Sequence, residues 1–312
     1  MAMAMAQGLN WDRDGRHWPH RERSHFIAAA GLRWHVQHWP PPAPGAPLLL
    51  LIHGTGSATH TWRHLAPALA PHFELLAMDL PGHGFSGPAV ADHHGHGASL
   101  GGMARGVTAL LAAWGARPRW VLGHSAGAAI AIRMALQASA AGAAPSWGPQ
   151  GLIGLNAALF PLPGLAGSLF SPAAKLLSLN PLVPHLFAWR ARQAKVVQQL
   201  LDGTGSTLDS AGTDLYRQVV TSPGHVAGAL AMMARWDLQA LAADLPRLHP
   251  PLNPALHLLV GERDGTVPPA DARRAQALVP GATLGVLPGL GHLAHEEDAL
   301  QVAPLVCRLI GR

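Results

Sequence analysis

Residues 123–127 fit the pattern G-x-S-x-G, with Ser125 at the centre. They follow a short apolar run that ends at Leu122 and precede an alanine-rich run whose apolar residues recur at helical spacing. A serine on such a sharp strand-to-helix turn needs small residues two positions away, because larger side chains would collide across the turn. The turn presents the hydroxyl above a sheet, beside a helix N-terminus that favours negative charge. Ser125 is therefore the candidate nucleophile.

Two further side chains with suitable chemistry follow predicted strands. Asp264 comes after the apolar run 256–260, and His292 comes after the run 282–287. A histidine activates a serine by removing its proton, and an aspartate fixes the tautomer of that histidine and stabilises its cation. Each residue also has a plainer interpretation, since Asp264 could cap the backbone of a glycine-rich turn and His292 is one of 20 histidines. Their joint occurrence at strand ends favours a Ser125-His292-Asp264 triad.

The elements that must position these residues alternate between strands and helices. Continuous apolar runs such as 48–52 are typical of parallel strands that are covered on both faces, and the alternating run 32–39 is typical of a half-buried strand. The full set of predicted strands is 25–30, 32–39, 48–52, 73–78, 120–122, 152–155, 256–260 and 282–287, with helices near 61–70, 99–114 and 296–310. This order predicts an α/β fold with a mostly parallel sheet, whose active site lies at the carboxyl ends of the strands.

Composition narrows the class of protein. The chain has 312 residues, 49% of them hydrophobic and 12% charged, which suits one globular domain or one domain with an insertion. Its formal charge is +5, and we find no basic run typical of a nucleic-acid surface, so no nucleic-acid partner is expected. Cys307 is the only cysteine and lies in an apolar helical pattern, which favours a core position, a reducing compartment and a cytoplasmic protein.

The two least regular segments are interpreted as follows. Residues 1–23 are charged and lack an apolar signal region, so we expect a poorly ordered tail that becomes ordered near Ser24. Residues 151–174 carry no charge and are long enough to span a membrane, but three prolines and two glycines after residue 160 would break such a helix. We expect a buried strand followed by an apolar lid, and no transmembrane segment.

From about Ser24 onward the chain resembles the α/β-hydrolases. The resemblance rests on residues 53–56, 79–84, the 123–127 turn, the acid turn 261–265 and the loop 289–292, which occur in the family's order. It implies a mostly parallel central sheet flanked by helices, with a core over 24–157 and 246–312 and a helical cap over 158–245, inserted after strand 6. The backbone N–H of Ala126, with that of Thr55 or Gly56, would donate to a developing oxyanion. His295 could compete with His292, but His292 fits the family's Gly-His loop better.

The predicted cap is rich in large apolar residues, which suits a large apolar ligand. Its alternative role is to pack the cap's own helices. No nucleotide-binding motif occurs, and neither a metal nor a cofactor is expected; residues 92–96, which are rich in histidine, are interpreted as a solvated loop. The candidate substrate-binding residues are His124, Phe160, Phe170, Met232, Met233 and Trp236.

Stretches of the cap around residues 155–161, 170–177, 203–209 and 225–233 are similar to the BchO family, which is described as a magnesium-chelatase accessory protein of bacteriochlorophyll-making bacteria. The resemblance implies a place in pigment synthesis at the periphery of the photosynthetic membrane, a porphyrin or its ester as small-molecule substrate, and association with magnesium chelatase. Three functions stay open: a serine hydrolase of a tetrapyrrole ester, a porphyrin-binding or chelatase-assisting protein with an idle triad, and a general carboxylesterase.

Overall fold

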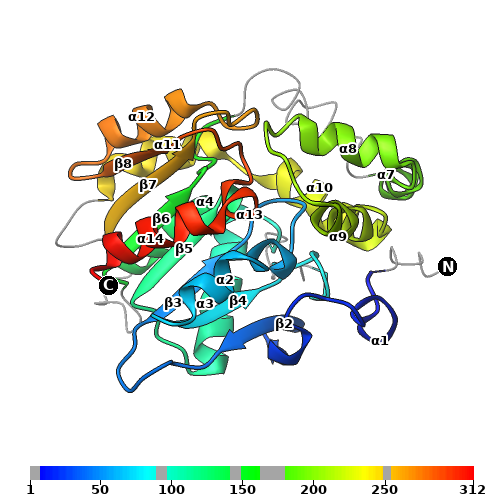
Figure 1. The fold of residues 1–312 in the computed structure, drawn as a ribbon, viewed down its shortest axis with the longest axis horizontal. Coiled ribbons are helices and arrows are strands. Elements are labelled where there is room, and N and C mark those ends of the chain that lie inside the picture. The colour runs from blue at the N-terminus through cyan, green and yellow to red at the C-terminus, as the bar shows by residue number, and fades with distance from the viewer. Residues whose placement is uncertain (1–7, 89–96, 141–148, 162–179, 249–253) are drawn as a thin grey trace.

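The computed structural model describes residues 8–88, 97–140, 149–161, 180–248 and 254–312 (Figure 1). Its strands form one sheet in the order β1-β2-β4-β3-β5-β6-β7-β8, in which β1, β2 and β4 pair antiparallel and the remaining pairs are parallel. The strands are β1 (Ser24–Ala29), β2 (Leu32–Trp39), β3 (Leu48–Ile52), β4 (Glu74–Met78), β5 (Trp120–His124), β6 (Gly151–Leu155), β7 (Ala255–Gly261) and β8 (Thr283–Leu287). Each predicted strand is present, with bounds that differ by a residue or two.

Helices cover both faces of this sheet. One face packs on α3 (Leu100–Trp114), α4 (Ala126–Ala140), α11 (Leu238–Asp244) and α12 (Pro269–Leu278), and the other on α2 (Leu65–Leu69) and α14 (Ala299–Ile310). The central strand β3 is buried at all five residues, as its apolar sequence predicts. Shorter elements are η2 (Thr59–Trp62), η3 (Leu245–Arg247) and α13 (Ala294–Glu297). The helix predicted over 296–310 is interrupted at Asp298, whose side chain caps α14.

Among the described residues between β6 and β7, the helices α7 to α10 lie beside the carboxyl ends of the strands (Figure 1). They are α7 (Leu182–Ala191), α8 (Ala194–Asp202), α9 (Ser210–Val220) and α10 (Pro223–Arg235). We call these four helices the cap. The boundaries 158 and 245 stay predictions; α11 falls within them although it packs against α4 in the main core.

The N-terminal segment differs from the predicted tail. Residues 8–23 form α1 (Trp11–Asp14) and η1 (Arg21–Arg23), and the side chain of Trp18 is only 2% exposed. The indole N–H of Trp18 donates to Thr59 Oγ1 at 3.0 Å, and the ring packs with cap residues of α8 and α9. The prediction weighted the charges of this segment and overlooked its tryptophans, whose burial orders the backbone around them.

Candidate active site

Ser125 lies at the turn between β5 and α4, 9% exposed, with φ at 51°. Its backbone N–H donates to Leu155 O at 2.9 Å, which ties the turn to the end of β6. A Cβ on Gly127 would lie 2.1 Å from Ile52 O, and one on Gly123 would lie 2.4 Å from the backbone of α4. Both glycines are therefore required by close backbone approach, as the pattern predicts.

His292 and Asp264 meet at the carboxyl ends of β8 and β7. Nδ1–H of His292 donates to Asp264 Oδ2 at 2.9 Å, and both side chains are nearly inaccessible. Asp264 Oδ1 accepts the backbone N–H groups of Thr266 and Val267, each at 2.8 Å. The aspartate thus both caps its turn and orients the histidine, so the two interpretations of this residue are compatible.

Asn156, which the sequence did not single out, is a further hydrogen-bond donor to this aspartate. The buried Asn156 amide donates from Nδ2 to Asp264 Oδ2 at 2.7 Å and to Gly291 O at 3.3 Å. Its φ of 49° is left-handed, a conformation that asparagine tolerates better than most residues. Burial raises the pKa of the Asp264 carboxyl, but His292, Asn156 and the backbone donors outweigh burial and lower that pKa below its ordinary value. The only signal in the sequence is an asparagine directly after an apolar strand.

The link between α8 and α9 joins the two loops that carry these residues. Thr204 O accepts the backbone N–H of His292 and that of Gly265, both at 3.0 Å. Ser206 Oγ accepts the N–H of Leu293 at 2.8 Å. A Cβ on Gly205 would lie 2.0 Å from the carbonyl of the residue before Asp264, so this link fits closely between the loops. We call residues 203–206 the cap link.

His124, the residue before Ser125, connects the serine turn to the loop that carries His292. Its Nε2–H donates to His292 O at 2.9 Å, and burial, more than any other influence, lowers its pKa to about 3. A neutral, 2% exposed ring in this position supports the backbone of His292. Its predicted contact with substrate stays a prediction.

His295 does not occupy the position of His292. Its Nε2 lies 2.7 Å from Thr61 Oγ1, and burial lowers its pKa well below the ordinary value. The hydroxyl of Thr61 donates to Glu296, which also pairs with Arg63 and accepts the hydroxyl of Tyr216 on α9 at 2.8 Å. This buried cluster connects η2 and α13 of the core to the cap.

The candidate oxyanion residues lie where β3 and α4 approach each other. Ala126 begins α4, so its N–H has no partner within the helix. Gly56 has a left-handed φ of 74°, and Thr55 Oγ1 lies 3.5 Å from Met232 Sδ on α10. The loop therefore contacts the cap directly, and its N–H groups and that of Ala126 come from adjacent elements.

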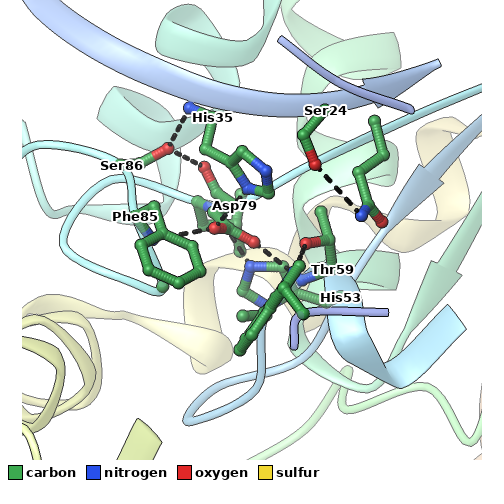
Figure 2. Close-up of polar contacts among 12 residues, drawn as sticks. Ser24, His35, His53, Thr59, Asp79, Phe85 and Ser86 are labelled. Carbon is green, nitrogen blue, oxygen red and sulfur yellow. Dashed lines mark hydrogen bonds and ion pairs between the residues drawn. The ribbon is translucent and has the colours of Figure 1, made fainter. Parts of the chain in front are cut away.

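A buried carboxylate, Asp79, binds the backbone of the segment that follows this loop (Figure 2). Asp79 accepts His35 Nδ1–H at 2.7 Å, the backbone N–H of Thr59 at 2.7 Å and that of Phe85 at 2.8 Å. Burial would raise the pKa of Asp79, but the charge and hydrogen bond of His35 and the other donors bring the pKa well below its ordinary value. The neighbouring His53 accepts the N–H of Leu80 at Nε2 and donates from Nδ1 to Gly54 O.

The apolar candidates for substrate binding mostly pack the interior. Phe160, Met232 and Trp236 belong to the main core cluster, and Arg274 stacks 4.1 Å above the ring of Phe160. Met233 is partly exposed. Phe170 and the loop 92–96 lie outside the described residues. The substrate contacts of these residues stay predictions, and packing already accounts for three of them.

A cavity of about 340 Å³ lies between α10 and the turn 82–88. Its described lining includes Gly82, His225, Gly228 and Arg235, but none of the triad or oxyanion candidates. Within the described part of the chain, no three His, Cys, Asp or Glu side chains are grouped to hold a metal ion. In the same residues, no helix has the length and apolar character needed to cross a membrane.

Comparison with family models matches residues 49–305 to the alpha/beta hydrolase family. The chain belongs to this family, as its sheet order and the residues at its strand ends indicate. Two solved structures show the same fold at low identity. An enol-lactonase from Burkholderia xenovorans LB400 has a TM-score of 0.67 at 19% identity, covering 92% of this chain and 100% of its own. A hydrolase from Pseudomonas aeruginosa PA01 has a TM-score of 0.67 at 22% identity, covering 93% and 98%.

A more specific similarity is to the magnesium-chelatase 30 kDa subunit of Rhodobacter capsulatus. The two sequences are 36% identical over 282 residues, which cover 90% of this chain and 92% of the relative. This relationship places the chain in the BchO family within the α/β-hydrolases, as the stretches of the cap indicated.

Proposed function

We propose that this protein is a serine hydrolase in which Ser125, His292 and Asp264 act as nucleophile, base and orienting acid. The observation that carries the proposal is the 2.9 Å hydrogen bond between His292 Nδ1 and Asp264, at the same end of the sheet as the left-handed serine turn. His124 supports it further, because the residue next to the serine donates to the backbone of His292. The pairing of α/β-hydrolase fold and family with this geometry favours catalysis over an idle site.

The proposed reaction follows from these residues. His292 Nε2 takes the proton of Ser125 as Oγ bonds to the ester carbonyl carbon. The N–H of Ala126, with that of Thr55 or Gly56, stabilises the oxyanion. The C–O bond to the leaving alcohol then breaks, and His292 returns the proton to that alcohol. Water hydrolyses the acyl-enzyme by the same steps, and Asp264 stabilises the imidazolium in both halves of the reaction.

The test is labelling of the purified chain with a fluorophosphonate probe, together with hydrolysis of an aryl ester. Wild type should label at Ser125, and Ser125→Ala should lose labelling and lower turnover by roughly 10⁴-fold with the fold intact by circular dichroism. Equal turnover by wild type and Ser125→Ala would contradict the proposal.

For the substrate we infer an ester of a large apolar molecule such as a tetrapyrrole. The relative named as a magnesium-chelatase subunit and the apolar composition of the chain between β6 and α8 support this inference. Titration with protoporphyrin IX, its magnesium form and its monomethyl ester, followed by the Soret band, should give micromolar binding. Absence of binding to all three, with rapid hydrolysis of short acyl esters, would leave a general carboxylesterase.

The second candidate function is an accessory role with an idle triad, in which the protein binds a porphyrin and associates with magnesium chelatase as a cytoplasmic protein peripheral to the membrane. The 36% identity to a magnesium-chelatase subunit favours it. It predicts that Ser125→Ala supports chelatase activity in a reconstituted assay as well as wild type does. A hydrolase that acts in the same pathway predicts that Ser125→Ala fails there.

A further inference from the structure

The helix α7 buries small residues and exposes large apolar ones, the reverse of an ordinary surface helix. Its buried residues are small, namely Pro184, Ala188 and Ala191, and they face the protein where α7 packs against α10. Its large apolar side chains point outward instead. Their exposed fractions are 71% for Leu182, 58% for Leu186, 37% for Phe187 and 58% for Trp189. Leu182, Leu186 and Trp189 are spaced i, i+4 and i+7, so they lie on one face of the helix, with Phe187 at its side. Such a row of exposed apolar side chains is unusual on a protein surface that faces only water.

The charged residues next to these side chains in the sequence all have a positive sign. Arg190, Arg192 and Lys195 follow directly at the end of α7 and the start of α8, and all three are exposed. The sequence has no Asp or Glu from residue 151 to residue 201, although the chain carries 17 acidic residues. The α7–α8 corner therefore presents leucines and aromatic rings beside three cations. In Figure 1 it lies at one end of the molecule, remote from the sheet.

This combination matches one kind of partner best. Aliphatic side chains enter the acyl boundary of a bilayer, tryptophan lies at the headgroup level, and arginine and lysine pair with anionic headgroups. A protein interface would also explain the apolar side chains and accepts arginine, but it does not require cations alone, whereas an anionic bilayer favours a segment with basic and no acidic residues. We propose that the exposed face of α7, with Arg190, Arg192 and Lys195, docks on an anionic lipid bilayer. The proposal does not depend on catalysis by Ser125.

The consequence for the cap is geometric. The helix α7 rests on α10, and Met232 of α10 contacts Thr55 of the candidate oxyanion loop. A bilayer bound at α7 would hold the cap, rather than the sheet, at the membrane surface. An amphiphilic ligand dissolved in that bilayer would meet the protein on the side that carries the cap.

The experiment is flotation of the full chain with vesicles of phosphatidylcholine alone or with 30% phosphatidylglycerol. Wild type should float with the anionic vesicles, and the bound fraction should fall with added salt and on neutral vesicles. The double variant Leu186→Ser/Trp189→Ser should weaken anionic binding by roughly tenfold or more, because each apolar side chain contributes its burial. Arg190→Glu/Arg192→Glu should weaken binding to anionic vesicles only.

The matched controls lie on other helices. Leu300 on α14 is 81% exposed, and Arg273 on α12 is also exposed. Leu300→Ser and Arg273→Glu should bind vesicles as wild type does. The unfolding temperature of each variant shows whether a loss of binding comes from misfolding. If Leu186→Ser/Trp189→Ser is misfolded, the single variant Leu186→Gln takes its place. Equal flotation of wild type and the α7 variants would overturn the proposal. So would a wild-type dimer that does not float and that dissociates on Leu186→Ser, because the face would then bind a second copy.

Discussion

The candidate site has two halves that are built in different ways. The serine half is local in sequence: Ser125 and the two glycines that permit its turn fall within residues 123–127. The acid–base half joins residues that are 28 positions apart, and it depends on Asn156 after β6 and on the cap link. A local turn is specified by its own residues, whereas the second half requires the sheet and the cap to be assembled first.

The largest expected effect is the loss of turnover when the pair of His292 and Asp264 is broken. Asp264→Asn keeps the volume but presents an amide that favours the wrong tautomer of His292, so turnover should fall by about 10⁴-fold. Stability should change much less, because Thr266 and Val267 can still donate to Oδ1. Single-turnover kinetics with an aryl ester and thermal unfolding measure both quantities. A loss below tenfold would mean that the acid–base half does not act as assigned.

Two alanine substitutions compare the halves directly. Gly127→Ala places a methyl group 2.1 Å from Ile52 O in the central strand, which cannot retreat, so it should destabilise the fold by about 3 kcal/mol. Gly205→Ala has a similar clash, with the backbone of the residue before Asp264, and a left-handed φ of 74°, but Gly205 is partly exposed and lies in a loop rather than in the central strand. We expect it to lower stability by about 2 kcal/mol, from the strain and the clash together, and turnover by at least tenfold, because Thr204 O would move away from His292.

The control for the second substitution is Gly281→Ala, where φ is 79° and no atom lies within 4 Å of the added methyl group. It has the backbone strain without the clash, so its stability should fall by about 1 kcal/mol, less than in Gly205→Ala, while turnover stays at the wild-type value. Urea unfolding and steady-state kinetics of the three variants give the comparison. Equal turnover in Gly205→Ala and Gly281→Ala would show that the cap link does not position His292.

Sequence reasoning was effective where the cause of a structure is local. Continuous apolar runs such as 48–52 predicted central parallel strands, because strands covered on both faces need apolar residues throughout, and alternation predicted β2. The glycines at 123 and 127 fit the turn by their own backbone contacts. It did not find Asn156 or Thr204 O, because an isolated asparagine or a backbone carbonyl carries no pattern. Trp18 was missed for a related reason: its burial depends on cap residues nearly 200 positions later. The roles of the triad stay predictions.

A smaller effect should separate strain from hydrogen bonding at Asn156. Asn156→Ala removes the donor to Asp264 and places alanine at a φ of 49°, so it should lower both turnover, by about tenfold, and stability. Asn156→Gly also lacks the amide but tolerates that φ, so it should show the same turnover loss with a smaller loss of stability. If Asn156→Gly turns over esters as wild type does, the amide does not support the acid–base half.

The smallest predicted effect is the loss of stability in acid that comes from a buried histidine of η2, outside both halves of the site. His60 is fully buried between Trp18 and Tyr216, with ring centroids 5.3 and 4.8 Å away. Its pKa lies well below the ordinary value because of burial, helped by the charge of Arg63. An unfolded histidine binds a proton near pH 6.5, so the unfolded chain takes up a proton that the folded chain does not. Stability therefore falls as pH drops below 6.5, by about 1.4 kcal/mol per pH unit for such a histidine.

Between pH 7 and 5.5, His60→Phe should lose about 1 kcal/mol less stability than wild type, whatever the steric effect of the ring. His17→Phe, at an exposed position, should follow the wild-type curve in urea unfolding. Parallel curves for His60→Phe and wild type would mean that His60 takes up its proton without unfolding. The loss of stability in acid would then have to arise from groups other than His60.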